Sequence, residues 1–196
     1  MGDFKEYGEG IEVRPLINDQ FLVCGSALCG GSSYAMLERF FRSYTSFAGL
    51  SDHSQYAAIN QLAEKAYKDR EQPLSVDTSF CGTRTDPHRR GAIRQIDLNH
   101  FTPSALALGV LDGICEELYQ LSHKMLVKKS RILASGGAIR RNPTLQKLLA
   151  DKFGMILTLS SVKEEAATGA ALFSAYCIGR TEYNSGFSAL SGDYNG

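Results

Sequence analysis

The sequence predicts an α/β domain with a mixed sheet and helices on both sides, and three patterns support this prediction. Residues 131–176 follow the order strand, helix, strand, helix, because two short apolar runs each precede a helical pattern. Residues 11–24 contain two strand-like runs around a polar turn, which predicts an antiparallel hairpin. Residues 102–121 carry apolar side chains at helical spacing, which predicts a long core helix. Parallel and antiparallel strands together give the mixed sheet.

The composition is that of an ordinary globular domain. Its 196 residues are 43% hydrophobic and 21% charged, which is enough for one sizeable core. Lys plus Arg and Asp plus Glu both number 21, so no broad basic face for nucleic acid or an anionic membrane is expected. No apolar run reaches the roughly 20 residues that span a bilayer, so we expect a soluble, intracellular protein.

The cysteines indicate a reducing compartment. Their number is odd and no two form a C-x-x-C pair, which argues against a disulfide framework and a zinc site. We therefore expect a cytoplasmic protein without a metal centre, in which most cysteines are small apolar core residues. The five are Cys24, Cys29, Cys81, Cys115 and Cys177.

The chain begins with a polar segment that leads into the hairpin. Residues 1–10 contain glycine and no apolar period, so we expect a flexible lead-in. Pro15 cannot donate to a strand ladder and therefore belongs at a sheet edge or at the end of its strand. Residues 25–33 have the G-x-x-x-x-G spacing of a phosphate loop, but Ser32 stands where such a loop needs lysine. We interpret this segment as the connection from a strand to a helix.

Two helices are predicted in the middle of the chain. Residues 52–69 begin with a capping-box pattern and continue with a helical one. Thr102 and Pro103 make a strong helix start, because threonine caps free N–H groups and proline suits the first helical position. Gly109 and Gly113 leave room for close approach of a neighbouring helix or the sheet.

The loop between these helices contains three candidate site residues. Within residues 80–91, Arg84 and Asp86 could pair across the turn or face a cleft, and Arg84 could neutralise a phosphate through two parallel hydrogen bonds. The alternative is structural: Arg84 and Arg90 brace the loop by donating to backbone carbonyls. Both interpretations stay open at this point.

A glycine pair stands between the predicted strand at residues 131–134 and the next helix. Gly136 and Gly137 allow a turn with positive φ and close approach of a ligand, because no Cβ is in the way. Asn142 is a good N-cap, and the free N–H groups of its helix suit phosphate or the edge of a nucleotide. The alternative is that the glycines only make a tight connection.

The last part of the chain predicts a second strand and a small-residue helix. Residues 155–159 form the apolar run, and residues 161–164 fit a capping box for the helix that follows. Residues 181–196 are rich in Gly, Ser, Asn and Tyr, so we expect a disordered tail.

Several of these segments together resemble the C-terminal domain of the FGGY carbohydrate kinases, and the nearest branch is the sedoheptulokinase-like one. The resemblance extends upstream to about Ile11 and implies a nucleotide-binding domain over residues 11–180. It also implies a ribonuclease H-like fold of the actin and hexokinase superfamily, incomplete because its first strands are missing. The matching segments are residues 80–91, residues 134–138, Asn142, Gln146, residues 150–154 and residues 164–172.

The resemblance implies that the glycine loop binds a nucleotide. In that family the loop lies along the adenosine and phosphates of ATP, and Mg²⁺ is held through the nucleotide. Binding of ATP or ADP is therefore expected at Gly136, Gly137, Ala138 and Asn142. Asn142 would cap its helix and could also contact the nucleotide.

The resemblance also implies that the sugar-binding half is missing. The family carries its sugar site in an N-terminal domain, and its catalytic aspartate follows a glycine at the start of the C-terminal domain. Gly2 and Asp3 do not continue that motif, so we expect a fragment without a catalytic residue, inactive alone. The implied substrate is a ketose such as sedoheptulose, with xylulose or another sugar as the alternative.

Two alternatives of other classes remain open. One is a non-catalytic nucleotide-binding or self-association module, in which an exposed apolar face and an uncovered sheet edge make a homodimer. The other is a complete small enzyme with Cys24, Cys29 or Cys81 as nucleophile, although no histidine stands in an evident partner motif.

Overall fold

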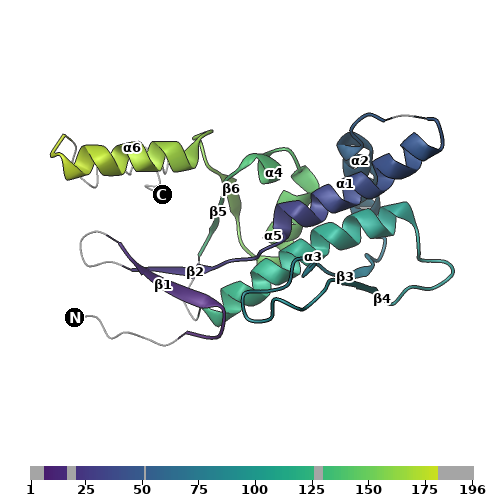
Figure 1. The fold of residues 1–196 in the computed structure, drawn as a ribbon, viewed down its shortest axis with the longest axis horizontal. Coiled ribbons are helices and arrows are strands. Elements are labelled where there is room, and N and C mark those ends of the chain that lie inside the picture. The colour runs from purple at the N-terminus through teal and green to yellow at the C-terminus, as the bar shows by residue number, and fades with distance from the viewer. Residues whose placement is uncertain (1–6, 17–20, 51, 126–129, 181–196) are drawn as a thin grey trace.

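Strands and helices are both spread along the described chain, which in this computed structural model comprises residues 7–16, 21–50, 52–125 and 130–180. The fold class is α/β, as predicted, and the strands form three two-stranded sheets with flanking helices (Figure 1). The elements are β1 Ile11–Pro15, β2 Phe21–Gly25, α1 Gly30–Phe47, α2 Tyr56–Lys68, β3 Ser75–Asp77, β4 Ala92–Arg94, α3 Pro103–Lys124, β5 Ile132–Ala134, α4 Gly137–Arg140, α5 Pro143–Phe153, β6 Leu157–Leu159 and α6 Glu165–Cys177.

The predicted hairpin is confirmed. Strands β1 and β2 pair antiparallel, and Pro15 forms the last pair, opposite Phe21, where a missing N–H costs the ladder least. The turn itself, residues 17–20, lies outside the described residues, as do residues 1–6 of the predicted lead-in and the predicted tail at residues 181–196. At the start of the described chain, the Glu9 carbonyl accepts a hydrogen bond from Lys124 Nζ at 3.3 Å.

Helix α3 forms the centre of the core. Its start is the predicted one: Thr102 Oγ1 accepts a hydrogen bond from the Ala105 N–H at 3.1 Å, and Pro103 follows. The predicted close approach at the glycines is to a strand segment. A Cβ at Gly109 would stand 2.4 Å from the Leu74 carbonyl oxygen, and one at Gly113 would stand 2.3 Å from that of Val76. Strand β3 therefore lies directly on α3.

Three further helices pack on α3. Figure 1 shows α1, α2 and α5 beside it, and α2 and α5 make the most extensive contacts with it. Their buried faces carry the periodicity expected of amphipathic helices. The buried residues from these helices include Leu37 from α1, Ile59 and Ala63 from α2, and Leu145 and Leu149 from α5.

The start of α2 differs from the prediction. The capping box expected at residues 52–55 is not used: the helix begins at Tyr56, and Gln55 at the N-cap position makes no side-chain cap. The Gln55 N–H instead donates to Glu38 Oε1 on α1 at 3.1 Å. The N-cap residue thus makes a tertiary hydrogen bond where a local cap was expected.

The predicted β-α-β-α unit is present, with one added turn. Strands β5 and β6 pair parallel, and Asn142 Oδ1 accepts from the Leu145 N–H at 3.0 Å, which confirms the predicted cap of α5. The short helix α4 lies between the glycine pair and α5. The capping box expected at residues 161–164 is wrong, because α6 starts at Glu165 without a side-chain cap. Arg140 bonds both the Val162 carbonyl and the Glu165 carboxylate, which holds this connection in another conformation.

Helix α6 extends away from the rest of the molecule. Figure 1 shows it projecting to one side of β5 and β6, and none of its thirteen residues is buried. Its sequence is nevertheless apolar all round, which is typical of helices that lie inside a protein. No helix of the described residues is long and apolar enough to cross a membrane.

Candidate functional site

A large cavity lies where the start of α1 faces the turn between β5 and α5. Its volume is about 910 Å³. The walls are mostly apolar and come from α1, α2, α3, β5, α4 and α5, with a few polar groups among them, which is the usual character of a small-molecule site. The lining residues include Gly30, Gly31, Tyr34, Tyr56, Asn60, Leu111, Ile114, Ser135, Ala138, Arg141 and Asn142.

The polar groups of this cavity form one hydrogen-bonded chain. The Tyr34 hydroxyl donates to Asn60 Oδ1, which also accepts from Asn142 Nδ2 at 3.2 Å. Asn142 Oδ1 in turn caps the Leu145 N–H. Helices α1, α2 and α5 are therefore tied together at the cavity wall, and Asn142 performs two structural tasks with one side chain.

Two tyrosine rings form part of the same wall. The ring centroids of Tyr34 and Tyr56 are 5.7 Å apart with the planes tilted by 33°. Burial raises the pKa of Tyr34 to about 12, against a smaller lowering by the Asn142 amide. Tyr34 therefore stays a neutral hydrogen-bond donor at physiological pH, and the wall offers flat, uncharged surfaces that can stack on an aromatic ring.

The glycine turn borders this cavity. Gly136 has φ 98°, a backbone conformation that favours glycine, and a Cβ there would meet no atom within 4 Å. Of the four residues predicted to bind a nucleotide, Ala138 and Asn142 line the cavity, whereas Gly136 and Gly137 lie between the lining residues Ser135 and Ala138. The turn is thus open on one side, as close approach of a ligand requires.

The opposite wall contains residues that the sequence did not single out as a site. Gly30 and Gly31 begin α1, and a Cβ at Gly31 would meet no atom within 4 Å. Their signal was present as a second glycine pair between a strand and a helix. Tyr34 and Asn60 gave no such signal, because each is an ordinary helical residue that only the packing of α1 on α2 brings to the cavity.

A smaller cavity of about 400 Å³ lies on another side of α3, between that helix, the hairpin and the loop after β3. Arg84 lines it and donates to Glu12 Oε1 on β1 at 2.7 Å. Asp77 lines it too. Burial alone would raise the pKa of Asp77, but hydrogen bonds from Arg89 and Ser79 outweigh burial and lower this pKa to about 2.

The other two loop candidates brace the loop itself. Arg90 Nη1 donates to the carbonyls of Pro87 and Arg89 at 2.9 and 2.8 Å, which is the structural alternative stated for this arginine. Asp86 Oδ1 accepts from the backbone N–H groups of His88 and Arg89. Neither Asp86 nor Arg90 lines either of the two cavities, so the structure separates them from Arg84.

The three cysteines considered as nucleophiles line neither cavity. Cys29 is only 1% exposed, and burial raises the pKa of its thiol, which disfavours the reactive thiolate. Across the described ranges, no group of three His, Cys, Asp or Glu side chains is placed to hold a metal ion.

The chain matches a known family over most of its length. The model of the FGGY family of carbohydrate kinases, C-terminal domain, covers residues 12–178. A search of curated proteins finds no match.

Solved structures with the same fold include xylulose, glycerol and gluconate kinases. The ligand-bound xylulose kinase from Lactobacillus acidophilus superposes with a TM-score of 0.72 at 19% identity over 92% of this chain and 36% of that one. Glycerol kinase from Plasmodium falciparum with ADP superposes with a TM-score of 0.71 at 18% identity, over 94% of this chain and 36% of that one. Gluconate kinase from Lactobacillus acidophilus superposes with a TM-score of 0.71 at 18% identity, over 92% of this chain and 36% of that one.

The chain therefore spans about a third of the length of these solved relatives. At such identity the likeness concerns the fold alone. The agreement of the family match with the fold leads to one conclusion: this chain belongs to the FGGY family of carbohydrate kinases and carries its C-terminal domain.

Proposed function

We propose that the larger cavity binds the adenosine part of ATP or ADP. The observation that carries the proposal is a cavity of about 910 Å³ that lies between the glycine turn before α4 and the two glycines that begin α1, and that presents both flat rings and amide groups. Adenine is flat and apolar on its faces but polar at its edges, which matches the rings of Tyr34 and Tyr56 and the amides of Asn60 and Asn142.

The glycine turns would receive the ribose and phosphates. Gly31 and Gly136 both have open space where a Cβ would stand, so a nucleotide can approach their backbones. The glycerol kinase from Plasmodium falciparum was solved with ADP, and its fold matches 94% of the present chain. Mg²⁺ would be held by the phosphates, where it neutralises charge during phosphoryl transfer.

The parent reaction would be phosphorylation of a sugar by Mg-ATP. The substrate we favour is a ketose such as sedoheptulose, and xylulose is the alternative. This chain would bind and orient the nucleotide. The sugar-binding site and the catalytic aspartate would be supplied by the other part of the kinase. Alone, the chain is expected to bind nucleotide weakly and to transfer no phosphoryl group.

The test is titration calorimetry of the full chain with Mg-ADP, repeated on Gly31→Leu. A leucine at position 31 would extend into open space at the cavity wall without striking the backbone, so it should occupy the cavity and leave the fold intact. We expect saturable binding to the original chain and affinity at least about tenfold weaker for the variant.

The matched control is Gly169→Leu, which makes the same change at a helical glycine with open space but outside the cavity. It should bind Mg-ADP as the original chain does. Saturable binding that Gly31→Leu leaves unchanged would place the nucleotide elsewhere. If the folded chain showed no binding at all, a site formed by this chain alone would be refuted.

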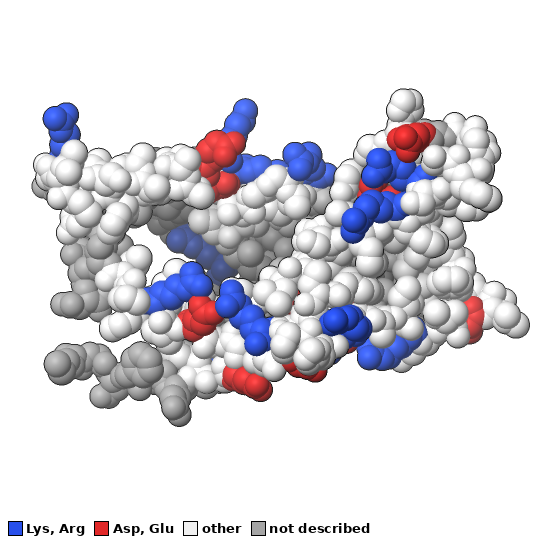
Figure 2. All heavy atoms as spheres, in the orientation of Figure 1, with Lys and Arg blue, Asp and Glu red and all other residues white. Residues whose placement is uncertain are grey.

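A second candidate function, self-association, is favoured by the exposure of α6. None of the thirteen residues of α6 is buried, although its sequence is mostly apolar, and an exposed apolar face is typical of a contact surface. Figure 2 shows that the surface of α6 carries no charged side chain between its ends. A second copy of this chain would cover that face.

Light scattering after size exclusion tests this candidate with Phe173→Glu. Phe173 lies on α6 and is 44% exposed, so a charge there should convert a dimer to a monomer if α6 is the interface. Phe47→Glu at the end of α1, where the side chain is 92% exposed, is the control and should leave the dimer unchanged. A monomeric mass at micromolar concentration would exclude self-association. This result would leave the nucleotide proposal unaffected.

A further inference from the structure

Two cysteines meet at the contact between the start of α1 and the loop after β3. Cys29 is the N-cap residue of α1 and is 1% exposed, whereas Cys81 is exposed in the loop. The Cys81 N–H donates a hydrogen bond to Cys29 Sγ at 3.0 Å. The two residues are 52 positions apart in sequence, so this contact is tertiary.

The segments around both cysteines are firmly placed. Ser33 Oγ on the first turn of α1 donates to the Thr78 carbonyl at 3.4 Å, which makes a second bond between the same two segments. Gly82 has φ 82°, and a Cβ there would stand 2.6 Å from the Pro87 carbonyl oxygen, so the loop closes tightly on itself. The two cysteines are therefore held together by the fold.

The geometry allows a disulfide. With N and Cα about 1.46 Å apart, the Cα of Cys81 lies within about 4.5 Å of Cys29 Sγ. Burial and a side-chain hydrogen bond with Cys81 both raise the pKa of the Cys29 thiol, in agreement with this short separation. A Cα this close to the partner sulfur is compatible with the separations found across a disulfide.

We propose that Cys29 and Cys81 form a reversible disulfide when a peroxide oxidises the exposed thiol of Cys81. The Cys81 sulfur attacks one peroxide oxygen, which yields a sulfenic acid and one water molecule. The buried Cys29 sulfur then attacks the sulfenic sulfur, the S–S bond forms, and the hydroxyl leaves as a second water with the Cys29 proton. The two cysteines lose two electrons and two protons, and the peroxide is reduced. A dithiol reverses the step.

The different solvent exposure of the two cysteines gives them different roles in the reaction. Cys81 is reached by the oxidant, whereas Cys29 is shielded and acts only as the resolving thiol. The bond would tie α1, which lines the larger cavity through Gly30 and Gly31, to the loop that lines the smaller one through Thr83 and Arg84. It would also close a long loop of chain, which stabilises a fold by restricting its unfolded state.

The experiment treats the reduced full chain with hydrogen peroxide, alkylates the remaining thiols and maps the peptides by mass. We expect an intact mass lower by about 2 Da and one cross-linked peptide that joins Cys29 to Cys81 and disappears with dithiothreitol. Cys24, Cys115 and Cys177 should remain alkylatable once the chain is unfolded. The oxidised chain should also melt about 5 °C or more above the reduced one.

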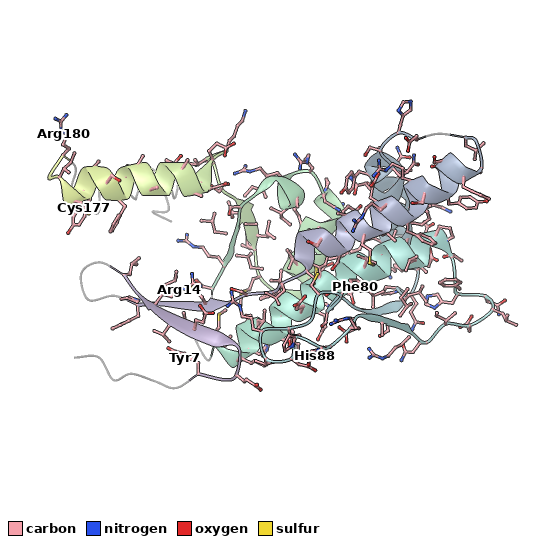
Figure 3. The ribbon with its side chains drawn as sticks, viewed as in Figure 1. Tyr7, Arg14, Phe80, His88, Cys177 and Arg180 are labelled. Carbon is pink, nitrogen blue, oxygen red and sulfur yellow. The ribbon has the colours of Figure 1, made fainter. Side chains whose placement is uncertain are left out.

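Two variants make the result specific. Cys81→Ser changes an exposed residue and should fold, but it should give neither the cross-link nor the rise in melting temperature. Cys177→Ser removes another exposed thiol, which Figure 3 places at the far end of α6, well away from Phe80 next to Cys81. This variant should behave as the original chain does. Oxidation of Cys81 to a sulfinic acid without a cross-link, a cross-link to another cysteine, or no reaction would each overturn the proposal.

Discussion

Helices α3 and α6 are both apolar, but their surroundings are opposite. Eleven of the 22 residues of α3 are buried, whereas α6 has no buried residue. α3 is enclosed by α1, α2, α5 and β3, and α6 is anchored mainly at its start by the Arg140–Glu165 ion pair. An apolar sequence thus indicates that a helix is stabilised by burial. Whether the helix is buried depends on which other elements pack against it in the fold.

Adding a methyl group to a glycine of each helix should give the largest contrast. Gly109→Ala in α3 would push a Cβ to 2.4 Å from the Leu74 carbonyl oxygen and should destabilise the fold by roughly 3 kcal/mol or more. Gly169→Ala in α6 has open space and should stabilise the helix by about 0.5–1 kcal/mol through its better helix propensity. Urea unfolding curves of both variants measure the difference.

Equal destabilisation by the two substitutions would contradict this contrast, because it would mean that α6 is packed as tightly as α3. A loss with Gly169→Ala that grows with protein concentration would instead point to the dimer interface, since only a self-associated chain crowds that position.

Low pH should also destabilise the α3 and α6 regions to different extents, but this difference in stability should be smaller than that between the glycine variants. Asp77, beside α3, has its pKa lowered from 3.8 to about 2, mainly because Arg89 and Ser79 bonds outweigh burial. A carboxyl with a lowered pKa in the folded state adds stability above its unfolded pKa, and that stability is lost as pH falls from about 4 to 2. After allowance for solvent screening, the loss should be about 1–2 kcal/mol, and Asp77→Asn should abolish this pH dependence.

Glu165 at the start of α6 is the comparison for Asp77. Its pKa is also lowered, first by the Arg140 hydrogen bond, but the pair stands at the edge of an exposed helix. Glu165→Gln should therefore change the acid midpoint of the fold less than Asp77→Asn does. Denaturation followed by circular dichroism between pH 7 and pH 2 measures both; a larger shift for Glu165→Gln would reverse the comparison.

The helix caps should show the smallest difference. Thr102→Ala removes a cap in which Oγ1 accepts from the Ala105 N–H, and it should cost about 1 kcal/mol. Glu164→Ala changes the N-cap residue of α6, whose side chain makes no cap hydrogen bond, and should cost little. Thermal unfolding of the two variants tests this, and an equal cost would mean that the Thr102 bond contributes nothing net.

The sequence predictions were correct where the interactions join residues close in sequence, and wrong where they join distant residues. The hairpin, the Thr102 cap, the Asn142 cap and the parallel pair of β5 and β6 were all predicted, because each depends on residues close in sequence or on a strong apolar run. The starts of α2 and α6 were predicted wrongly. At both starts the structure has a hydrogen bond with a residue distant in sequence, Glu38 for α2 and Arg140 for α6.

The same distinction applies to the cavity. Its glycine turn and Asn142 were identified as candidates from local pattern and family resemblance. Tyr34, Tyr56 and Asn60 were not, because nothing in a single helix tells which of its residues will face a helix elsewhere in the chain. Arg84 and Arg90 gave equal signals in sequence, and only their partners in the fold distinguish them.

The sequence by itself determined the α/β class and the order of most elements, since periodicity, caps and turn residues act over a few positions. The family came from the resemblance of several segments to the FGGY kinases, and the family match confirms it. The tertiary structure decided the rest. It alone joined α1, α2 and α5 into one cavity, set Cys29 against Cys81 and left α6 uncovered. The physical reason is that burial and side-chain pairing depend on which distant segments share a surface, and no local pattern records that choice.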